Sequence, residues 1–213
     1  MSAETFESLN KNILVGFTDP QYGRGNAWHY RADLQGDEPN HYPHAIPVDD
    51  VLRRLYNFDV VESSRIVMEF DMPDGSVRRV VDTERKAVGR SDQDTIFAVF
   101  KDAYQPHQPK EWMLESVANI IDDNDLSIGT AGNLKDGART FVTIEMPETI
   151  TVSDFGFRPH LLACTSHDGS LASTYQLIST IVVCDNTLSA ALMESTPKYK
   201  VRHRDRKSTR LNS

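Results

Sequence analysis

The chain has 213 residues, of which 39% are hydrophobic and 25% charged, and its formal net charge at pH 7 is −8. This length suits one sizeable domain or two small ones, and the acidic balance argues against a protein that coats nucleic acid through many phosphate contacts. The sequence contains neither a run of about 18 apolar residues nor a secretory signal pattern. We therefore expect a soluble, cytoplasmic protein.

Residues 1–45 predict an irregular N-terminal region that docks on the core. Gly, Asp, Asn, Pro and His are frequent there, and no helical or strand period recurs. A short aromatic and basic run lies within the region, namely Trp28, His29, Tyr30 and Arg31. Such a run is typical of surfaces that stack on the bases of single-stranded DNA. The alternative is that the aromatic side chains only hold a loop against the core.

Residues 46–205 predict a single α+β domain, in which hairpins build a largely antiparallel β-sheet and two or three helices pack on it. Apolar residues at helical spacing indicate helices, and alternating apolar residues between turn signals indicate strands. The expected helices span residues 46–56, 109–121 and 186–193. The buried stripe of the second helix is expected to consist of Leu114, Val117, Ala118 and Ile121. The expected strands span residues 65–72, 76–82, 86–90, 95–101, 126–130, 140–146, 160–165 and 172–184. The segment 95–101 also fits a helical period.

The last third of the chain contains two polar clusters that flank an apolar run. The first cluster consists of Ser166, His167, Asp168, Gly169 and Ser170, and the second contains Cys184, Asn186 and Thr187. Because Asp-Gly favours tight turns, the first cluster predicts a turn between two strands. The second predicts a helix start that is capped by Asp185 or Asn186.

Cys184, His167 and Asp168 are the candidate catalytic residues. A thiol at a helix N-terminus has a lowered pKa, and His167 could act as its base, with Asp168 or Asp185 orienting the imidazole. The alternative is a buried thiol beside an ordinary helix cap. Cys164, His167 and Cys184 could hold zinc, but the sequence offers no second close pair of ligands. We therefore predict no metal and no cofactor.

Residues 206–213 differ in character from the rest of the chain. The segment 207–213 resembles the translated read-through of a sequencing adapter, and it has no apolar period and no helix cap. We expect residues 206–213 to be an artefactual tail and the domain to be truncated at its C-terminal end.

Several blocks, taken in order and with their approximate spacing, resemble the phage/plasmid-like protein family, known as domain of unknown function 932. The blocks are residues 27–29, 46–55, 90–92, 104–106, 130–134, 166–170, 182–188 and 202–203. The resemblance implies an origin in phage, prophage or plasmid genomes and a further, largely helical section after the last block. It brings no settled biochemical activity.

From this resemblance we expect a non-catalytic accessory protein in phage or plasmid DNA transactions, located in the cytoplasm of a bacterial host cell. The expected partners are single-stranded DNA or other phage or plasmid proteins. The sequence leaves open whether the protein forms an oligomer. A small Cys/His-dependent enzyme and a structural or interaction module are the alternatives.

Overall fold

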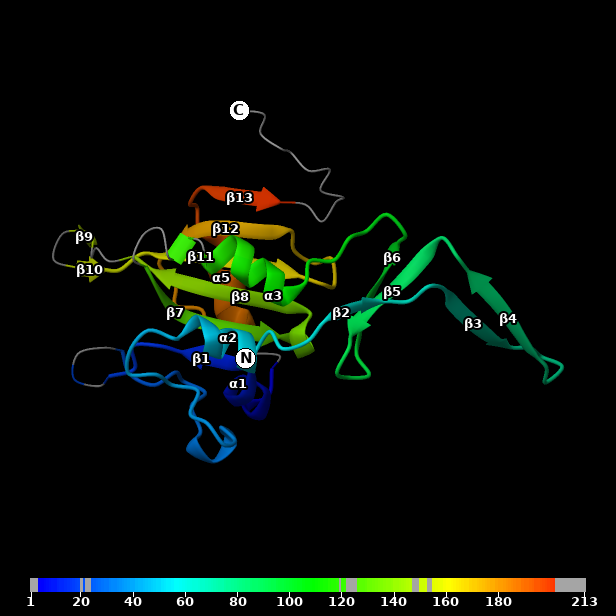
Figure 1. The fold of residues 1–213 in the computed structure, drawn as a ribbon, viewed down its shortest axis with the longest axis horizontal. Helices are drawn as coiled ribbons and strands as arrows, with labels where there is room; N and C mark the ends of the chain where they lie inside the picture. The colour runs from blue at the N-terminus through cyan, green and yellow to red at the C-terminus, as the bar shows by residue number, and fades with distance from the viewer. Residues whose placement is uncertain are drawn as a thin grey trace.

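The computed structural model describes residues 4–19, 21, 24–118, 120–121, 126–146, 150–152 and 155–201. Its centre is a six-stranded antiparallel sheet with the strand order β1-β7-β8-β11-β12-β13 (Figure 1). The strands are β1 (Ile13–Val15), β7 (Ser127–Leu134), β8 (Arg139–Glu145), β11 (His160–Ser166), β12 (Ser173–Ile178) and β13 (Lys198–Val201). This arrangement confirms the α+β class. Among the described residues, no helix is long and apolar enough to span a membrane.

Helices pack on both faces of this sheet. Successive side chains of a strand point to opposite faces, so Phe141 and Leu162 pack with α5 (Asp185–Met193). Their neighbours Val142 and Ala163 pack with α2 (Val48–Arg54) and α3 (Pro109–Trp112). The sheet therefore separates two apolar cores, and the helix expected from residue 46 is confirmed as α2.

The N-terminal region contains regular structure that the sequence pattern did not predict. It forms α1 (Phe6–Asn12), β1 and a short 3-10 turn, η1 (Ala32–Leu34). Strand β1 is an edge of the sheet, where Ile13 lies opposite Gly132 of β7. The expectation of an irregular region was therefore wrong for residues 6–15. Phe6 and Leu9 are the two apolar residues of α1, and β1 has three residues, so neither element shows a clear hydrophobic period.

Residues 60–101 form a projection that we call the arm, which extends to the right of the sheet in Figure 1. It contains β2 (Val60–Glu62), β3 (Ile66–Asp71), β4 (Val77–Asp82), β5 (Arg85–Arg90) and β6 (Ile96–Lys101). Strand β2 pairs with β5, β3 pairs with β4, and β6 pairs with β5. The hairpin expected at residues 65–82 is confirmed, and segment 95–101 is a strand.

The arm is a bent ribbon because the strand pairing changes at Ser63. Before this residue β2 pairs with β5, and after it β3 pairs with β4. The Ser63 amide donates to the Ala87 carbonyl at 2.9 Å, and the Ser63 hydroxyl accepts from the Ala87 amide at 2.9 Å. Beyond this bend β3 and β4 pair only with each other.

The helix expected from Pro109 has a different buried face from the one predicted. After α3 the chain continues as a π-helical turn, η2 (Met113–Ala118). The wider turn changes which side chains face the sheet, so Trp112, Met113 and Val117 are buried, whereas Leu114 is 42% exposed. The prediction that Leu114 belongs to the buried stripe was therefore wrong.

The strand expected at residues 172–184 is also shorter than predicted. Strand β12 ends at Ile178, and the following amides of Ser179 and Thr180 donate to the Glu194 carboxylate at 2.8 and 3.0 Å. These bonds replace the pairing of a further strand. Within the sheet, the register of β7 with β8 shifts between Ile128 and Thr130.

A separate two-stranded sheet, made of β9 (Ile150–Val152) and β10 (Phe155–Phe157), lies between β8 and β11 in the chain. It was not predicted. The predicted tail at residues 206–213 lies outside the described residues.

Candidate functional site

The first polar cluster forms the turn between β11 and β12, as predicted. Gly169 has a φ of +73°, and a Cβ atom there would lie 2.8 Å from the Phe100 ring, so both conformation and space require glycine. Ser166 closes the turn, because its hydroxyl donates to the Leu171 carbonyl at 3.0 Å and accepts from the Leu171 amide at 2.9 Å.

His167 is fully buried at this turn. Its ring stacks on Phe97 of β6, with a centroid distance of 5.7 Å and an interplanar angle of 28°. Its amide donates to the Ala138 carbonyl at 2.7 Å. The stacking contact with Phe97 joins the arm to the sheet, so it gives His167 a structural role in the packing of β6.

Asp168 is bound within the same turn. Its carboxylate accepts from the Ser170 amide at 2.9 Å and from the Ser170 hydroxyl, and it lies 3.8 Å from Nε of Arg139. Burial acts to raise the pKa of Asp168, but the hydrogen bonds from Ser170 and the charge of Arg139 lower it below its ordinary value overall. The carboxylate is therefore an anion that stabilises the turn.

The second polar cluster starts α5, and Thr187 organises it. The Thr187 hydroxyl accepts from the Val183 amide at 2.9 Å and the Cys184 amide at 3.0 Å, and it lies 3.4 Å from Sγ of Cys184. Cys184 occupies the N-cap position, and Asn186 is exposed. The expected cap by Asp185 or Asn186 was therefore wrong, because a hydroxyl three residues inside the helix reaches back to the cap.

Cys184 and His167 contact different parts of the molecule. Cys184 is 2% exposed and packs in the core beneath α5, together with Cys164 and Leu188. His167 instead stacks against the arm. Burial raises the pKa of Cys164 to about 12. The contacts of these residues give no support to catalysis by Cys184, His167 and Asp168, and that hypothesis stays a prediction.

The cysteine and histidine side chains do not form a metal centre in the described part of the chain. There, no group of three His, Cys, Asp or Glu side chains is placed to hold a metal ion. The zinc ligands considered from the sequence, Cys164, His167 and Cys184, are among the residues to which this statement applies.

The aromatic run of the N-terminal region divides into a docked part and an exposed part. His29 is fully buried, and Tyr30 packs edge-on against His41 at 4.7 Å between ring centroids. Trp28 is 56% exposed and meets Phe6 of α1 edge-on at 5.6 Å. The second half of the run therefore anchors a loop whose first residue, Trp28, faces solvent, and nucleic-acid contact by this run stays a prediction.

His29, which is buried, and His41, which is half-buried, are neutral at neutral pH. Burial lowers the pKa values of His29 and His41 to about 4. The Ala27 amide donates to Nε2 of His41 at 3.0 Å, so the ring proton is on Nδ1, which lies 2.6 Å from Oδ1 of Asn40.

Arg31 does not present an isolated positive charge. Its Nε and Nη2 atoms donate to the two carboxylate oxygens of Asp33 at 3.0 and 2.9 Å. Four residues were proposed for nucleic-acid contact. Trp28 is the one of them whose side chain is exposed and is not held in an ion pair.

Sequence reasoning missed a charged group at one end of the sheet. The Glu145 carboxylate is almost fully buried and forms ion pairs with Arg24 and with Nη1 of Arg158, the latter at 3.1 Å. Burial, followed by the charges of these two arginines, lowers the pKa of the neighbouring His160 to about 4. The three charged residues are more than a hundred positions apart at their extremes, so no local motif could reveal the group.

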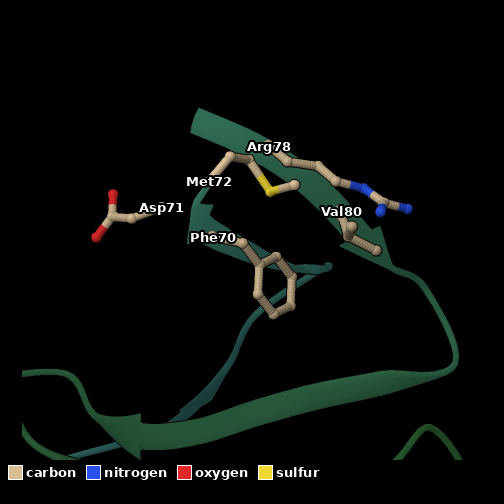
Figure 2. A pocket seen from close by; sticks show the side chains of 5 residues that line it. All are labelled: Phe70, Asp71, Met72, Arg78 and Val80. Atoms are coloured by element: carbon tan, nitrogen blue, oxygen red, sulfur yellow. The ribbon is translucent and has the colours of Figure 1, made fainter. Parts of the chain in front are cut away.

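The arm exposes several large apolar side chains. The residues concerned are Val61, Val67, Phe70, Val77, Val81, Ile96 and Val99. Near the tip of the ribbon, a shallow pocket is lined by Phe70, Asp71, Met72, Arg78 and Val80 (Figure 2). Exposed apolar surface of this kind is typical of interaction sites.

Comparison with known proteins identifies a family but no characterised relative. A family model described as a domain of unknown function (DUF932) matches residues 96–213, which is more than half of the chain. The matched range begins at β6 and includes both polar clusters. No curated protein and no solved structure matches the chain. The chain therefore belongs to the family of domain of unknown function 932.

Proposed function

We propose that the protein is a non-catalytic accessory protein in phage or plasmid DNA transactions and that it binds single-stranded DNA through Trp28. The observation that carries this proposal is the 56% exposure of the Trp28 side chain on a loop that is otherwise anchored in the core. An exposed indole offers a π face to any base, so stacking does not depend on sequence.

The loop that carries Trp28 is held in place before any ligand binds. The buried side chain of Asn10 donates through Nδ2 to the His29 carbonyl at 2.8 Å, and its Oδ1 accepts from the Arg31 amide at 3.0 Å. These bonds fix the residues on either side of Tyr30 to α1. A preformed platform loses little conformational entropy when a base stacks on it.

The charges near Trp28 support stacking rather than strong phosphate binding. Arg31 is paired with Asp33, and Lys11 of α1 is paired with Glu7 at 2.8 Å. If both cations moved to phosphates, the slope of log K against log salt concentration would be about −1.4, since single strands give roughly −0.7 per contact. We therefore expect weak salt dependence.

The state of the two thiols supports the non-catalytic part of the proposal. Cys164 and Cys184 are both buried, and neither forms a disulfide. A nucleophilic thiol must meet its substrate as a thiolate, and these buried groups offer no exposed sulfur for that reaction.

The proposal is tested by fluorescence anisotropy of a labelled oligothymidine at low salt, with the wild-type protein and the Trp28→Ala variant. Stacking contributes about 1–3 kcal/mol per base, so we expect the variant to bind roughly 5- to 150-fold more weakly. Trp28→Phe is the matched control and should keep most of the affinity.

Intrinsic fluorescence gives a second readout of the same contact. The chain contains two tryptophans, and Trp112 is buried, so quenching by the oligonucleotide reports Trp28. Absence of binding by the wild-type protein, or equal binding by Trp28→Ala, would remove the nucleic-acid part of the proposal.

A further inference from the structure

Strand β3 has a free edge. It belongs to a two-stranded sheet, and among the strands of the described residues β4 is its one neighbour. The Met72 amide donates to the Ser76 carbonyl at 2.8 Å, and hydrogen-bonded pairs alternate along an antiparallel ladder. The backbone N–H and C=O groups therefore bond to β4 at Ile66, Met68 and Phe70. The backbone groups of the residues between them point away from β4.

This edge is unprotected against another strand. Proline, charged side chains (lysine above all) and bulges are the usual devices that block edge pairing. Strand β3 contains no proline, lysine or bulge, and its charged residues are Glu69 and Asp71. Phe70 and Val67 beside the edge are 49% and 47% exposed. A hairpin of two strands is marginally stable in water by itself, so a further strand on this edge would stabilise the tip of the arm.

Several cations of the arm are already paired with carboxylates, which disfavours nucleic acid as the partner of this surface. The ion pairs Arg79–Glu69, Arg85–Asp82 and Lys86–Glu62, with N–O distances of 2.6 to 2.9 Å, neutralise the cations concerned. Phosphate binding would require these cations to leave their carboxylates.

The residues along β3 are complementary to the same strand running in the opposite direction. Arg65 and Asp71 are exposed, lie three positions on either side of Met68, and form no ion pair with any described residue. We propose that β3 of a second copy of this chain pairs with β3 antiparallel, with a two-fold axis at Met68. The arm is then a dimerisation element.

This register brings apolar residues together on one face of the ribbon and opposite charges together on the other. It places Ile66 opposite Phe70 of the second copy, and Arg65 opposite Asp71 of the second copy. Figure 2 shows the Asp71 side chain pointing away from Phe70, as expected for adjacent positions of a strand. The apolar contacts therefore form on one face and the two ion pairs on the other.

The neighbouring registers are less favourable. The odd-numbered residues of β3 have the backbone groups that point away from β4. In a β3–β3 pair these groups must bond to each other, so every possible register places odd-numbered residues opposite odd-numbered residues. A two-fold axis at Glu69 places two Glu69 carboxylates opposite each other. An axis at Val67 places Asp71 opposite Ser63, which already bonds to Ala87.

The first test is the mass of the protein by light scattering at high protein concentration. We expect about twice the chain mass of 24.0 kDa. The Val67 amide points away from β4, and proline has no N–H group. Val67→Pro therefore removes a donor from the free edge without removing a hydrogen bond of the hairpin, so this variant should be monomeric. Val81→Pro is the matched control, because Val81 faces Val67 across the hairpin and has its amide on the opposite edge. It should stay dimeric.

Charge exchange tests the register independently of the stability of the hairpin. Arg65→Asp and Asp71→Arg each place like charges opposite each other at two positions and should weaken association about tenfold or more. The double variant restores both pairs and should restore the dimer. A monomeric wild-type protein, or a double variant that associates no better than the single variants, would overturn the proposal.

A cross-link gives a direct readout of the axis. Met68→Cys places two thiols in a non-hydrogen-bonded pair, where Cα atoms lie about 4.5 Å apart and a disulfide can form. Ile66→Cys, whose expected partner is Phe70, should not cross-link, and the native cysteines are buried. Trp28→Ala should leave the dimer unchanged, so this inference and the DNA-binding proposal fail separately.

Discussion

Replacement of Thr187 by Val is expected to destabilise the fold, although the side chain keeps its shape. The Thr187 hydroxyl accepts two amides, those of Val183 and Cys184, and both of these residues are buried. A buried amide without an acceptor costs about 1–3 kcal/mol. Thr187 itself is half-buried, so water can partly replace the hydroxyl, and we expect a total loss of about 2 kcal/mol, at the upper end of helix-cap effects.

Urea denaturation followed by circular dichroism measures this loss, and thermal unfolding should show a midpoint lower by about 4–8 °C for a chain of this size. Asn186→Ala is the matched control. Asn186 is exposed one position earlier in α5, and alanine favours helix, so we expect a change within about 0.5 kcal/mol. The reasoning is refuted if Thr187→Val is as stable as the wild-type protein, or if Asn186→Ala loses as much.

Two further predictions concern the buried titratable groups. Because Cys164 and Cys184 are buried, neither should react with Ellman's reagent at pH 8 in the native protein, whereas both should react in denaturant; rapid native labelling would contradict their placement. The pKa values of His29, His41 and His160 are lowered from 6.5 to about 4, so between these values the unfolded chain binds protons that the folded chain does not. Stability should therefore fall as the pH is lowered from 7 to 5, and a urea midpoint that is the same at both pH values would argue against neutral buried histidines.

Local signals were sufficient where the fold depends on local contacts. The hairpin of β3 and β4 follows from alternating apolar residues on either side of Pro73, Asp74 and Gly75, and the β11–β12 turn follows from Asp168 and Gly169. In both hairpins the strands and the turn lie within about 20 residues, so the pattern contains the whole interaction. The end of β12 could not be predicted in this way, because the acceptor that replaces its ladder is Glu194, sixteen residues after Ile178.

The same distinction explains the candidate site. The residue types of the two polar clusters could be read from the sequence. Whether His167 and Cys184 lie close together depends on where β12 ends and on how α5 crosses the sheet. The exposure of Trp28 beside the buried His29 was equally hidden, because an irregular loop has no period from which a face can be assigned. The cap at Thr187 was missed because Asp and Asn are the more frequent cap residues.

The position of β1 has a consequence for how the chain is made. Ile13 pairs with Gly132, so the ribosome adds more than a hundred residues before this partner exists, which takes roughly 6–24 s at bacterial or eukaryotic rates. The ribbon of β3 and β4, in contrast, can close on a microsecond timescale once it has emerged. Nascent chains therefore acquire the arm early and complete the sheet late, and the apolar segment Ile13–Val15 lacks its partner strand during this interval.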